Sequence, residues 1–580
     1  MGNDQRMQNL DSERTCLQRL AFIYLAVMLL ALSATTVRGQ SRHDTVSIEV
    51  DAADAVGAMN PMWAYWGYDE PNYTYMHDGK KLLSEIADLS PVPVYVRAHN
   101  ILNTGDGKPS LKWGSTNIYT EDKDGNPVYD WTIVDQIFDT FVRRGMKPLV
   151  EIGFMPKALS THPEPYRHHW SPNQPYQNIF TGWAYPPKNY QKWADFITKW
   201  VNHCIHRYGK AEVKSWWWEV WNEPNIDYWK GSEQEYFKLY DYTVNAVRRA
   251  LPEAKVGGPA TTGPGWDQAA RWLRDFLEHC RNSTNPATGK TGAPLDFISY
   301  HAKGAPKVVD GHVRMNMGSE LNDVETGFQI VSSSPYKDLP IIISEADPEG
   351  CAACSMELHP QNAYRNGTMY SSYTASVFAK MYQLADQYDV NLEGALSWSF
   401  EFENEDWFAG FRSMATHGVD KPVLNVFRMF GMMQGQRVAV KQEKAITPQE
   451  IIKSGVHGKK PDVNALASKA DHTIYVMVWN YHDDHLPAPD TPVTIKIENI
   501  GSTKALLSQY RVDENHSNSY TLWREMGAPQ QVTDKQYKKL EEAGQLDLLD
   551  SPKWIHVPSK VAQISFSLPR HGVSLFKLSW

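Results

Sequence analysis

The chain has 580 residues, which is too long for one compact core and indicates two domains or a large barrel with an appendage. Hydrophobic residues make up 42% of the chain and charged residues 22%, as is ordinary for a soluble globular protein. The net charge of −9 is spread along the chain without a Lys/Arg block, which argues against a nucleic-acid partner.

The first segment with a pattern of its own is the apolar run LAFIYLAVMLLAL at residues 20–32. Arg14 and Arg19 precede it, and small residues lead from it to Gly39. This length is typical of a signal peptide and falls short of the about 20 residues that span a bilayer. We therefore expect residues 1–39 to be removed on export to the periplasm or beyond, leaving a mature chain without a membrane partner. An N-terminal membrane anchor is the alternative.

Eight short apolar runs alternate with helical patterns between residues 58 and 435. Nearly continuous apolar character over four to eight residues is typical of strands buried on both faces. Between the runs, Ile133, Ile137 and Phe141 form an apolar helical stripe between Asp130, a fitting N-cap, and Gly145, and residues 232–235 read as a capping box. The alternation predicts an α/β fold, a parallel (β/α)8 barrel. The runs are residues 62–68, 92–97, 147–154, 215–221, 254–258, 295–301, 339–345 and 394–400.

The pattern changes after residue 435. Segments such as HTIYVMVWNY and TPVTIKIENI alternate apolar and polar residues between turn signals, which predicts a C-terminal β-sandwich over residues 436–580. A polar, partly helical excursion interrupts it at about residues 512–552. Residues 40–57 contain the strand-like TVSIEVDA and are expected to join the sandwich, so that residues 58–435 form the barrel.

Four cysteines remain after the expected signal cleavage: Cys204, Cys280, Cys351 and Cys354. Cys351 and Cys354 form a single C-x-x-C, without a second pair for zinc or a thioredoxin-like context. We expect a loop staple or two free thiols, and the disulfide state of all four stays open. The chain also lacks the H-E-x-x-H, Walker and Gly-rich motifs of metal and nucleotide sites, so no metal or cofactor is expected.

Two predicted strands end on glutamates. The aromatic run SWWWEVW leads into Asn222 and Glu223, and the seventh run ends at Glu345. The C-terminal ends of barrel strands meet at one rim, so Glu223 and Glu345 can face each other there. The tryptophans would give Glu223 a stiff, poorly hydrated floor. Two facing carboxylates, one protonated and one ionised, are what glycoside hydrolysis requires, whereas a lone strand-end glutamate is more often part of a salt bridge.

Six motifs in order resemble glycoside hydrolase family 39, the β-xylosidases and α-L-iduronidases. The resemblance runs from about residue 45 to the end of the chain. It implies a retaining hydrolase that acts on a carbohydrate without a cofactor, with Glu223 as acid/base and Glu345 as nucleophile. The motifs are VYVRAHNIL (94–102), KPLVEIGFMPKAL (147–159), WEVWNEPN (218–225), KVGGPAT (255–261), HGVDKP (417–422) and DENHSNSYTLW (513–523).

The resemblance also implies sugar contacts by position, although each of these residues could instead be purely structural. Lys303 is similar to the lysine with which iduronidases pair the uronate carboxylate, where xylosidases often carry an aromatic residue. After the eighth strand, WSFEFENEDWF offers Glu401, Glu403 and Glu405 as readers of sugar hydroxyls, and we take Glu403 as the candidate. The remaining implied contacts are Asn222 at the sugar 2-hydroxyl, Arg97, His99 and His301 lining the pocket, and Trp398 as its floor.

These observations favour an exported exo-β-xylosidase that releases xylose from β-xylosides and xylo-oligosaccharides through a covalent glycosyl-enzyme intermediate. One alternative is an α-L-iduronidase-like or other pyranosidase of the same family. A catalytically inactive carbohydrate-binding protein is another, and such a protein would be expected to lack one of the two carboxylates. The exact sugar, exo or endo action, the role of the sandwich and the oligomeric state stay open.

Overall fold

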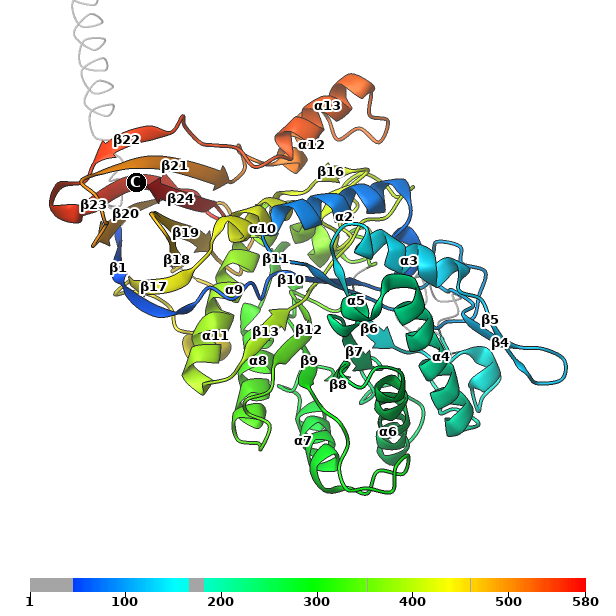
Figure 1. Ribbon diagram of the computed structural model, residues 1–580. Helices are drawn as coiled ribbons and strands as arrows, with labels where there is room; N and C mark the ends of the chain where they lie inside the picture. Colours follow the sequence, from blue (N-terminus) through cyan, green and yellow to red (C-terminus); the bar gives the residue numbers. More distant parts are fainter. Residues whose placement is uncertain (1–44, 166–181, 352, 459) are drawn as a thin grey trace, which may run out of the picture. The chain divides into compact units, whose positions relative to one another are not determined.

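Two nine-stranded sheets organise the chain in the computed structural model, which describes residues 45–580 apart from 166–181, 352 and 459 (Figure 1). The predicted signal peptide lies outside the described residues. Within the described ranges, no helix is both long enough and apolar enough to cross a membrane.

The first sheet is the predicted (β/α)8 barrel. All eight predicted strands are present and pair in parallel, and the eighth is divided into two short pieces by Leu396. One piece, β13, pairs with β12, and the other, β14, pairs with β2, so the eighth strand closes the barrel. The strands are β2 (Tyr65–Tyr68), β3 (Tyr95–Ala98), β6 (Lys147–Ile152), β7 (Trp217–Val220), β8 (Lys255–Thr261), β9 (Phe297–Lys303), β12 (Ile341–Asp347), β13 (Leu392–Ala395) and β14 (Ser397–Trp398).

A helix follows each barrel strand. Helix α6 begins with the predicted capping box. The side chain of Ser232 accepts a hydrogen bond from the Glu235 amide, and the side chain of Glu235 accepts one from the Ser232 amide. Helix α3 starts at Thr132, and Asp130 accepts the Thr132 amide from outside the helix instead of acting as its N-cap. The helices are α2 (His77–Leu89), α3 (Thr132–Val142), α4 (Tyr190–Tyr208), α6 (Glu233–Ala250), α7 (Asp267–Asn282), α8 (Met317–Ser332), α9 (Thr368–Tyr388) and α10 (Pro422–Met432).

The tryptophans before Glu223 pack on both faces of β7. Trp217 lies among apolar residues of the other strands inside the barrel, such as Tyr65 and Phe297. Trp216 and Trp218 lie on the opposite face, against aromatic rings of α3 and α4. Because side chains alternate along a strand, the residue two positions beyond Trp217 must also face the barrel interior. That residue is Glu219, whose side chain is fully buried.

The second sheet is the C-terminal β-sandwich. It folds around an apolar core shared by strands from both of its layers. Residues 46–52 of the strand-like segment lie in this sheet, because β1 pairs antiparallel with β17 and parallel with β20. Residues 46–580 form one compact unit, so the boundary at residues 435/436 stays a prediction. The strands are β1 (Val46–Ala58), β17 (Gln436–Lys441), β18 (Asp462–Ala470), β19 (Thr473–Tyr481), β20 (Thr491–Glu498), β21 (Lys504–Val512), β22 (Lys553–His556), β23 (Ala562–Leu568) and β24 (Val573–Ser579).

The polar excursion between β21 and β22 contains helices α12 (Ser519–Glu525) and α13 (Asp534–Ala543), which lie over the barrel side near α2 in Figure 1. Trp523 and Leu540 of the excursion share an apolar cluster with Trp407 and Phe408, which follow β14. The sandwich therefore reaches back to the loops at the C-terminal ends of the barrel strands.

The cysteines divide into two kinds. Cys351 and Cys354 form a disulfide in the segment that follows β12, so the loop-staple expectation describes them. Cys204 on α4 and Cys280 on α7 are free and buried.

Candidate active site

Three side chains at the C-terminal rim of the barrel lie close enough to act on one atom. A carboxylate oxygen of Glu223, a ring nitrogen of His301 and a carboxylate oxygen of Glu345 all lie within 4.8 Å of one another. The structure therefore brings the two predicted carboxylates together. Retaining glycosidases hold their carboxyl groups about 5–5.5 Å apart, whereas inverting enzymes need about 6.5–9.5 Å.

Local backbone irregularities set the orientation of both glutamates. The pairing of β12 with β9 shifts after Ile343, so that Glu345 instead of Ser344 stands opposite His301. This bulge turns Glu345 to the barrel interior. At the end of β7, Trp221 and Glu223 adopt left-handed backbone conformations with φ of 73° and 45°, and the Glu223 amide donates to the Ala260 carbonyl at 2.8 Å. Such conformations cost about 1–3 kcal/mol each and recur at functional sites.

Cations surround Glu345. Lys303 Nζ lies 2.8 Å from one of its carboxylate oxygens, and Arg97 Nη1 lies 3.2 Å from the other. Burial alone would raise the pKa of the Glu345 carboxyl, but His301, Lys303 and His99 outweigh burial and hold that pKa well below its usual range. Glu345 is therefore the carboxylate that stays ionised.

Glu223 has a different environment. Its Oε1 forms a 2.9 Å hydrogen bond with Nδ1 of His301, and its side chain is 15% exposed, against 8% for Glu345. Within the described residues, no lysine or arginine forms a salt bridge with Glu223. The two carboxylates therefore have unlike surroundings, as the two roles in a retaining glycosidase require.

Arg97 is the buried centre beneath the two glutamates. Its guanidinium contacts Glu219 at 2.5 Å and Glu151 at 3.0 Å in addition to Glu345. It also donates to Oδ1 of Asn222 at 3.1 Å, which leaves the amide NH2 of Asn222 as that side chain's donor. Glu151 and Glu219 were missed from the sequence. The sequence feature that could have identified them is a charged residue at an inward-facing position of an otherwise apolar strand.

His99 bridges Arg97 to a second acidic group. Its Nδ1 lies 3.0 Å from Asp69, which also pairs with Lys112 at 2.8 Å, and its Nε2 lies 2.8 Å from Glu151. Burial opposes a charged imidazole, but Glu151 and Asp69 outweigh burial and raise the pKa of His99 well above its usual range. His99 is therefore a further cation 3.4 Å from Glu345.

Trp398 lies beside these charged groups at the end of β14. The Trp398 ring meets the His99 ring edge-on at 4.4 Å between centroids, and the Arg97 guanidinium lies 5.0 Å from its centroid. Gly67 on the neighbouring β2 makes room, since a Cβ there would stand 2.3 Å from Trp398 ring atoms. The position suits the predicted floor of a sugar pocket, because an aromatic face packs against apolar sugar hydrogens.

A chain of ion pairs continues from Lys303 into the loop after β12. Lys303 pairs with Asp347, and Asp347 lies 3.2 Å from Arg412. Arg412 contacts Glu349, and Arg365 pairs with the same carboxylate. Burial opposes ionisation of Glu349, but the two arginines outweigh burial and lower its pKa to about 2. No strand pattern marks these loop contacts, which explains why the sequence did not predict them.

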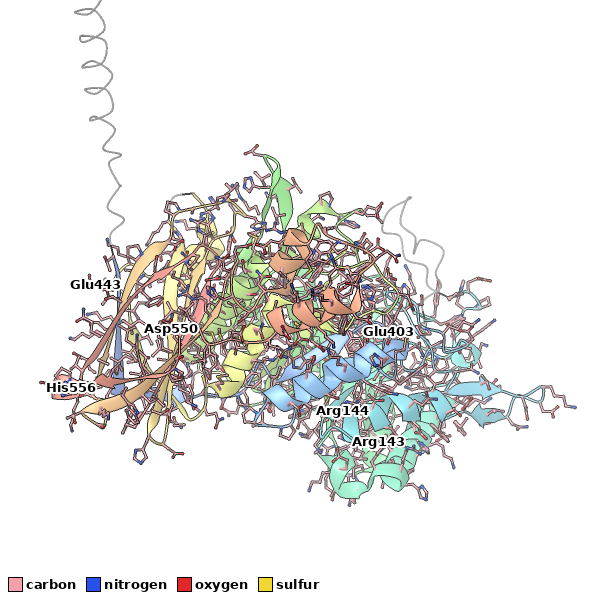
Figure 2. All side chains as sticks on the ribbon, turned by 90° about the horizontal axis from the view of Figure 1, so that it is seen from above. Arg143, Arg144, Glu403, Glu443, Asp550 and His556 are labelled. Atoms are coloured by element: carbon pink, nitrogen blue, oxygen red, sulfur yellow. A yellow bond between two sulfur atoms is a disulfide. The ribbon has the colours of Figure 1, made fainter. Side chains whose placement is uncertain are left out.

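Glu403 does not join this cluster, and we do not retain it as a sugar contact. Its carboxylate accepts from the Asp78 amide at 2.7 Å, at the start of helix α2, where Figure 2 labels it. An anion is favourable there because of the free amides of a helix N-terminus. Glu401 is buried and accepts from the Gly418 amide, while Glu405 borders a groove described below. The three candidate glutamates after β14 thus have three different surroundings.

The cluster of Glu223, His301 and Glu345 could hold a cation by distance alone. Its charges argue otherwise, since Glu345 already pairs with Lys303 at 2.8 Å. The donor set is therefore suited to carboxylate chemistry.

Two facing carboxylates of unlike environment, at the C-terminal rim of a (β/α)8 barrel, define the class of glycoside hydrolases. Comparison with known proteins gives the particular family. The family model of glycosyl hydrolases family 39 matches residues 46–548, and the chain belongs to that family.

Individual relatives include β-xylosidases and α-L-iduronidases. The chain is 28% identical over 455 residues to a β-xylosidase of Geobacillus stearothermophilus, a match that covers 75% of this chain and 77% of the relative. It is 25% identical over 523 residues to the α-L-iduronidase of Mus musculus, covering 85% and 75%. Its fold is similar to that of a monomeric β-xylosidase from Caulobacter crescentus CB15, with a TM-score of 0.71, 21% identity, and coverage of 92% and 99%.

Proposed function

We propose that this protein is a retaining β-xylosidase that releases xylose from the non-reducing end of β-xylosides and xylo-oligosaccharides. The observation that carries the proposal is the pair Glu223 and Glu345, whose oxygens lie within 4.8 Å while only Glu345 has lysine and arginine partners among the described residues. β-Xylosidases among the relatives support the choice of sugar.

In the first step, Glu345 attacks the anomeric carbon as the ionised carboxylate. Glu223 donates its proton to the glycosidic oxygen as the bond to the leaving group breaks, so the aglycone departs as a neutral alcohol. The product is a glycosyl ester on Glu345 with inverted configuration. The Oδ1 of Asn222 accepts from Arg97, which supports a role for its amide nitrogen as the donor to the sugar 2-hydroxyl.

In the second step, Glu223 acts as a base. It takes a proton from a water molecule, and the resulting oxygen nucleophile attacks the anomeric carbon and displaces Glu345. Configuration is inverted a second time and therefore retained overall. Glu223 ends protonated and Glu345 ionised, as both began, so no cofactor is consumed.

The test uses an aryl glycoside panel with the product anomer followed by NMR. Retention on aryl β-xyloside is expected. Glu345→Ala should be rescued by azide as the α-xylosyl azide, because azide then displaces the aglycone directly. Glu223→Ala should be rescued as the β-xylosyl azide, because azide then attacks the glycosyl-enzyme. Wild-type turnover in both variants would refute the assigned roles.

An α-L-iduronidase-like activity is the second candidate. Lys303 favours it, because its ammonium lies at the rim next to Glu345 and Asp347, where a uronate carboxylate could pair with it. Relative rates on aryl α-iduronide and aryl β-xyloside decide between the two activities. An inactive sugar-binding protein is disfavoured by the presence of both carboxylates.

Export also belongs to the proposal, on the strength of the apolar run at residues 20–32. N-terminal sequencing of the secreted protein should find a mature chain that begins near Gln40.

A further inference from the structure

A groove of 780 Å³ lies among loops at the C-terminal ends of the barrel strands, outside the cluster of Glu223 and Glu345. We name it the rim groove. Its walls come from residues 355–363 after β12, residues 404–411 after β14, and Trp523 and Gln530 of the excursion between β21 and β22, with Leu111 at one end. Binding sites for small ligands typically measure about 300–1,000 Å³, so the rim groove can hold more than one sugar ring.

The rim groove has the composition of a carbohydrate site. Trp407, Trp523 and Phe411 line the groove with 6–7% of each residue exposed, so they form a packed apolar wall against which the apolar part of a sugar can lie. Glu357 and Asp406 supply carboxylates that accept hydrogen bonds from paired hydroxyls. Both acids are exposed, so their hydrogen-bonding capacity faces solvent in the unliganded protein.

The walls are held rigidly before any ligand arrives. Gln530 accepts from the Trp407 amide at 2.8 Å and donates back to its carbonyl, which ties the excursion to the loop after β14. The Met356 amide donates to the Ala409 carbonyl at 2.8 Å, which joins the other two walls. Arg365 reaches carbonyls on both loops. A preformed groove binds without the entropy cost of ordering its walls.

One wall of the groove is linked to the nucleophile strand β12. Phe411 in the groove precedes Arg412, whose guanidinium contacts Asp347 two residues beyond Glu345. Asp347 also accepts from the backbone amide of Trp398. The rim groove and Glu345 thus adjoin the end of β12, and Glu223, which follows β7, lies at the same face of the barrel.

We propose that the rim groove binds the leaving-group end of a neutral glycan chain while its terminal sugar lies between Glu223 and Glu345. The proposal rests on the glycosidase function above and extends it to a preference for oligosaccharides over short aglycones. The groove is a specificity site, separate from the residues that perform the chemistry.

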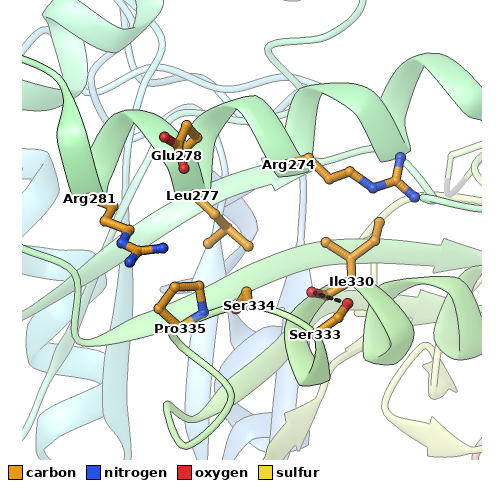
Figure 3. Close-up of a pocket in the computed structure, with 8 residues that line it drawn as sticks. All are labelled: Arg274, Leu277, Glu278, Arg281, Ile330, Ser333, Ser334 and Pro335. Carbon is orange, nitrogen blue, oxygen red and sulfur yellow. Dashed lines mark hydrogen bonds between the residues drawn. The ribbon is translucent and has the colours of Figure 1, made fainter.

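Charge selects a neutral chain. The described lining of the rim groove contains Glu357, Glu405 and Asp406 and no lysine or arginine. Three carboxylates repel sulfated or uronate-rich chains, in particular at low ionic strength. A pocket between α7 and α8 on the barrel flank shows the contrast, since Arg274 and Arg281 border only 180 Å³ there and its described lining has no aromatic ring (Figure 3).

The experiment compares kcat/KM for xylotetraose and for 4-nitrophenyl β-xyloside. The test variant is Glu357→Gln with Asp406→Asn, and Ala363→Trp is a second variant that fills the groove. Glu443→Gln is the matched control, an exposed acid on the sandwich (Figure 2). Thermal unfolding of each variant checks that the fold is kept. Binding of xylotetraose, cellotetraose and a chondroitin tetrasaccharide to Glu345→Gln is measured by calorimetry.

Wild-type enzyme should prefer xylotetraose over the aryl xyloside. The test variants should lose about tenfold on xylotetraose, or about 1.4 kcal/mol, with little change on the aryl xyloside. Equal losses on both substrates, no loss on xylotetraose, or tighter binding of the chondroitin chain would overturn the proposal. If wild type cleaves no β-xyloside, the xylosidase assignment fails instead, and the calorimetric panel still decides whether the groove binds a neutral chain.

Discussion

Lys303→Met is the sharpest test of the charge arrangement at the nucleophile. The lysine Nζ lies 2.8 Å from Glu345, and methionine keeps most of the side-chain volume without the charge. Lys303 is among the largest influences that lower the pKa of Glu345. Removing the cation therefore raises that pKa, and the enzyme should lose its ionised nucleophile at a higher pH than wild type.

The expected size follows from the geometry. Two unit charges 4 Å apart interact by about 4 kcal/mol at an effective dielectric constant of about 20, and each pKa unit corresponds to about 1.4 kcal/mol. Lys303 is shared with Asp347, which also pairs with Arg412, so only part of that energy acts on Glu345. We expect the acid limb of kcat/KM to move upward by about one unit.

The assay is the pH dependence of kcat/KM on aryl β-xyloside, which reports groups of the free enzyme. Lys307→Met is the matched control, an exposed lysine four residues further along. A Lys303→Met profile that coincides with wild type on its acid side would refute the electrostatic account. A lower plateau without a moved limb would give Lys303 a positioning role instead.

Three further predictions test the supports of the site. Arg97→Met removes the salt-bridge partner of the buried Glu219 and one of the two partners of Glu151, and it should cost about 3–5 kcal/mol in the free energy of unfolding, with a smaller loss at acid pH, where the buried carboxylates of the variant protonate; a wild-type melting temperature at pH 7 would contradict this. Gly67→Ala should lower kcat by moving the Trp398 ring, visible as a changed tryptophan emission spectrum; unchanged emission and kcat would oppose it. Ser232→Ala should cost about 1 kcal/mol and speed hydrogen exchange at the start of α6, whereas Ser232→Asp should preserve both.

The barrel was predictable because parallel strands buried on both faces leave continuous apolar runs at regular spacing. The sandwich was predictable where one strand face meets solvent and the residues alternate. The same rule missed β18, whose first seven residues are all buried although Asp462, Asn464 and Ser468 are polar. Pattern reasoning works when polar residues mark the solvent face, and it fails where polar side chains are buried.

The residues of the site also divide into those that could be predicted from the sequence and those that could not. Glu223 and Glu345 end strands, and strand ends of a closed barrel must meet at the rim. Glu403 follows a strand that has already ended, in a loop where Asn404 and Phe408 take left-handed conformations with φ of 67° and 49°. The direction of such a loop depends on contacts with distant segments, among them Gln530. One sequence does not contain that information in any local pattern.

Arg97 positions Glu345 inside the barrel without being a main influence on the pKa of that carboxylate. It forms a salt bridge with Glu345. Glu151 and Glu219 lie on its other sides and balance its charge, so the larger influences on the pKa of Glu345 come from His301 and Lys303. The two buried carboxylates thus leave Arg97 mainly a positional task. It fixes the positions of Asn222 and Glu345 relative to each other, while His301 and Lys303 of β9 supply the larger influences that lower the pKa of Glu345.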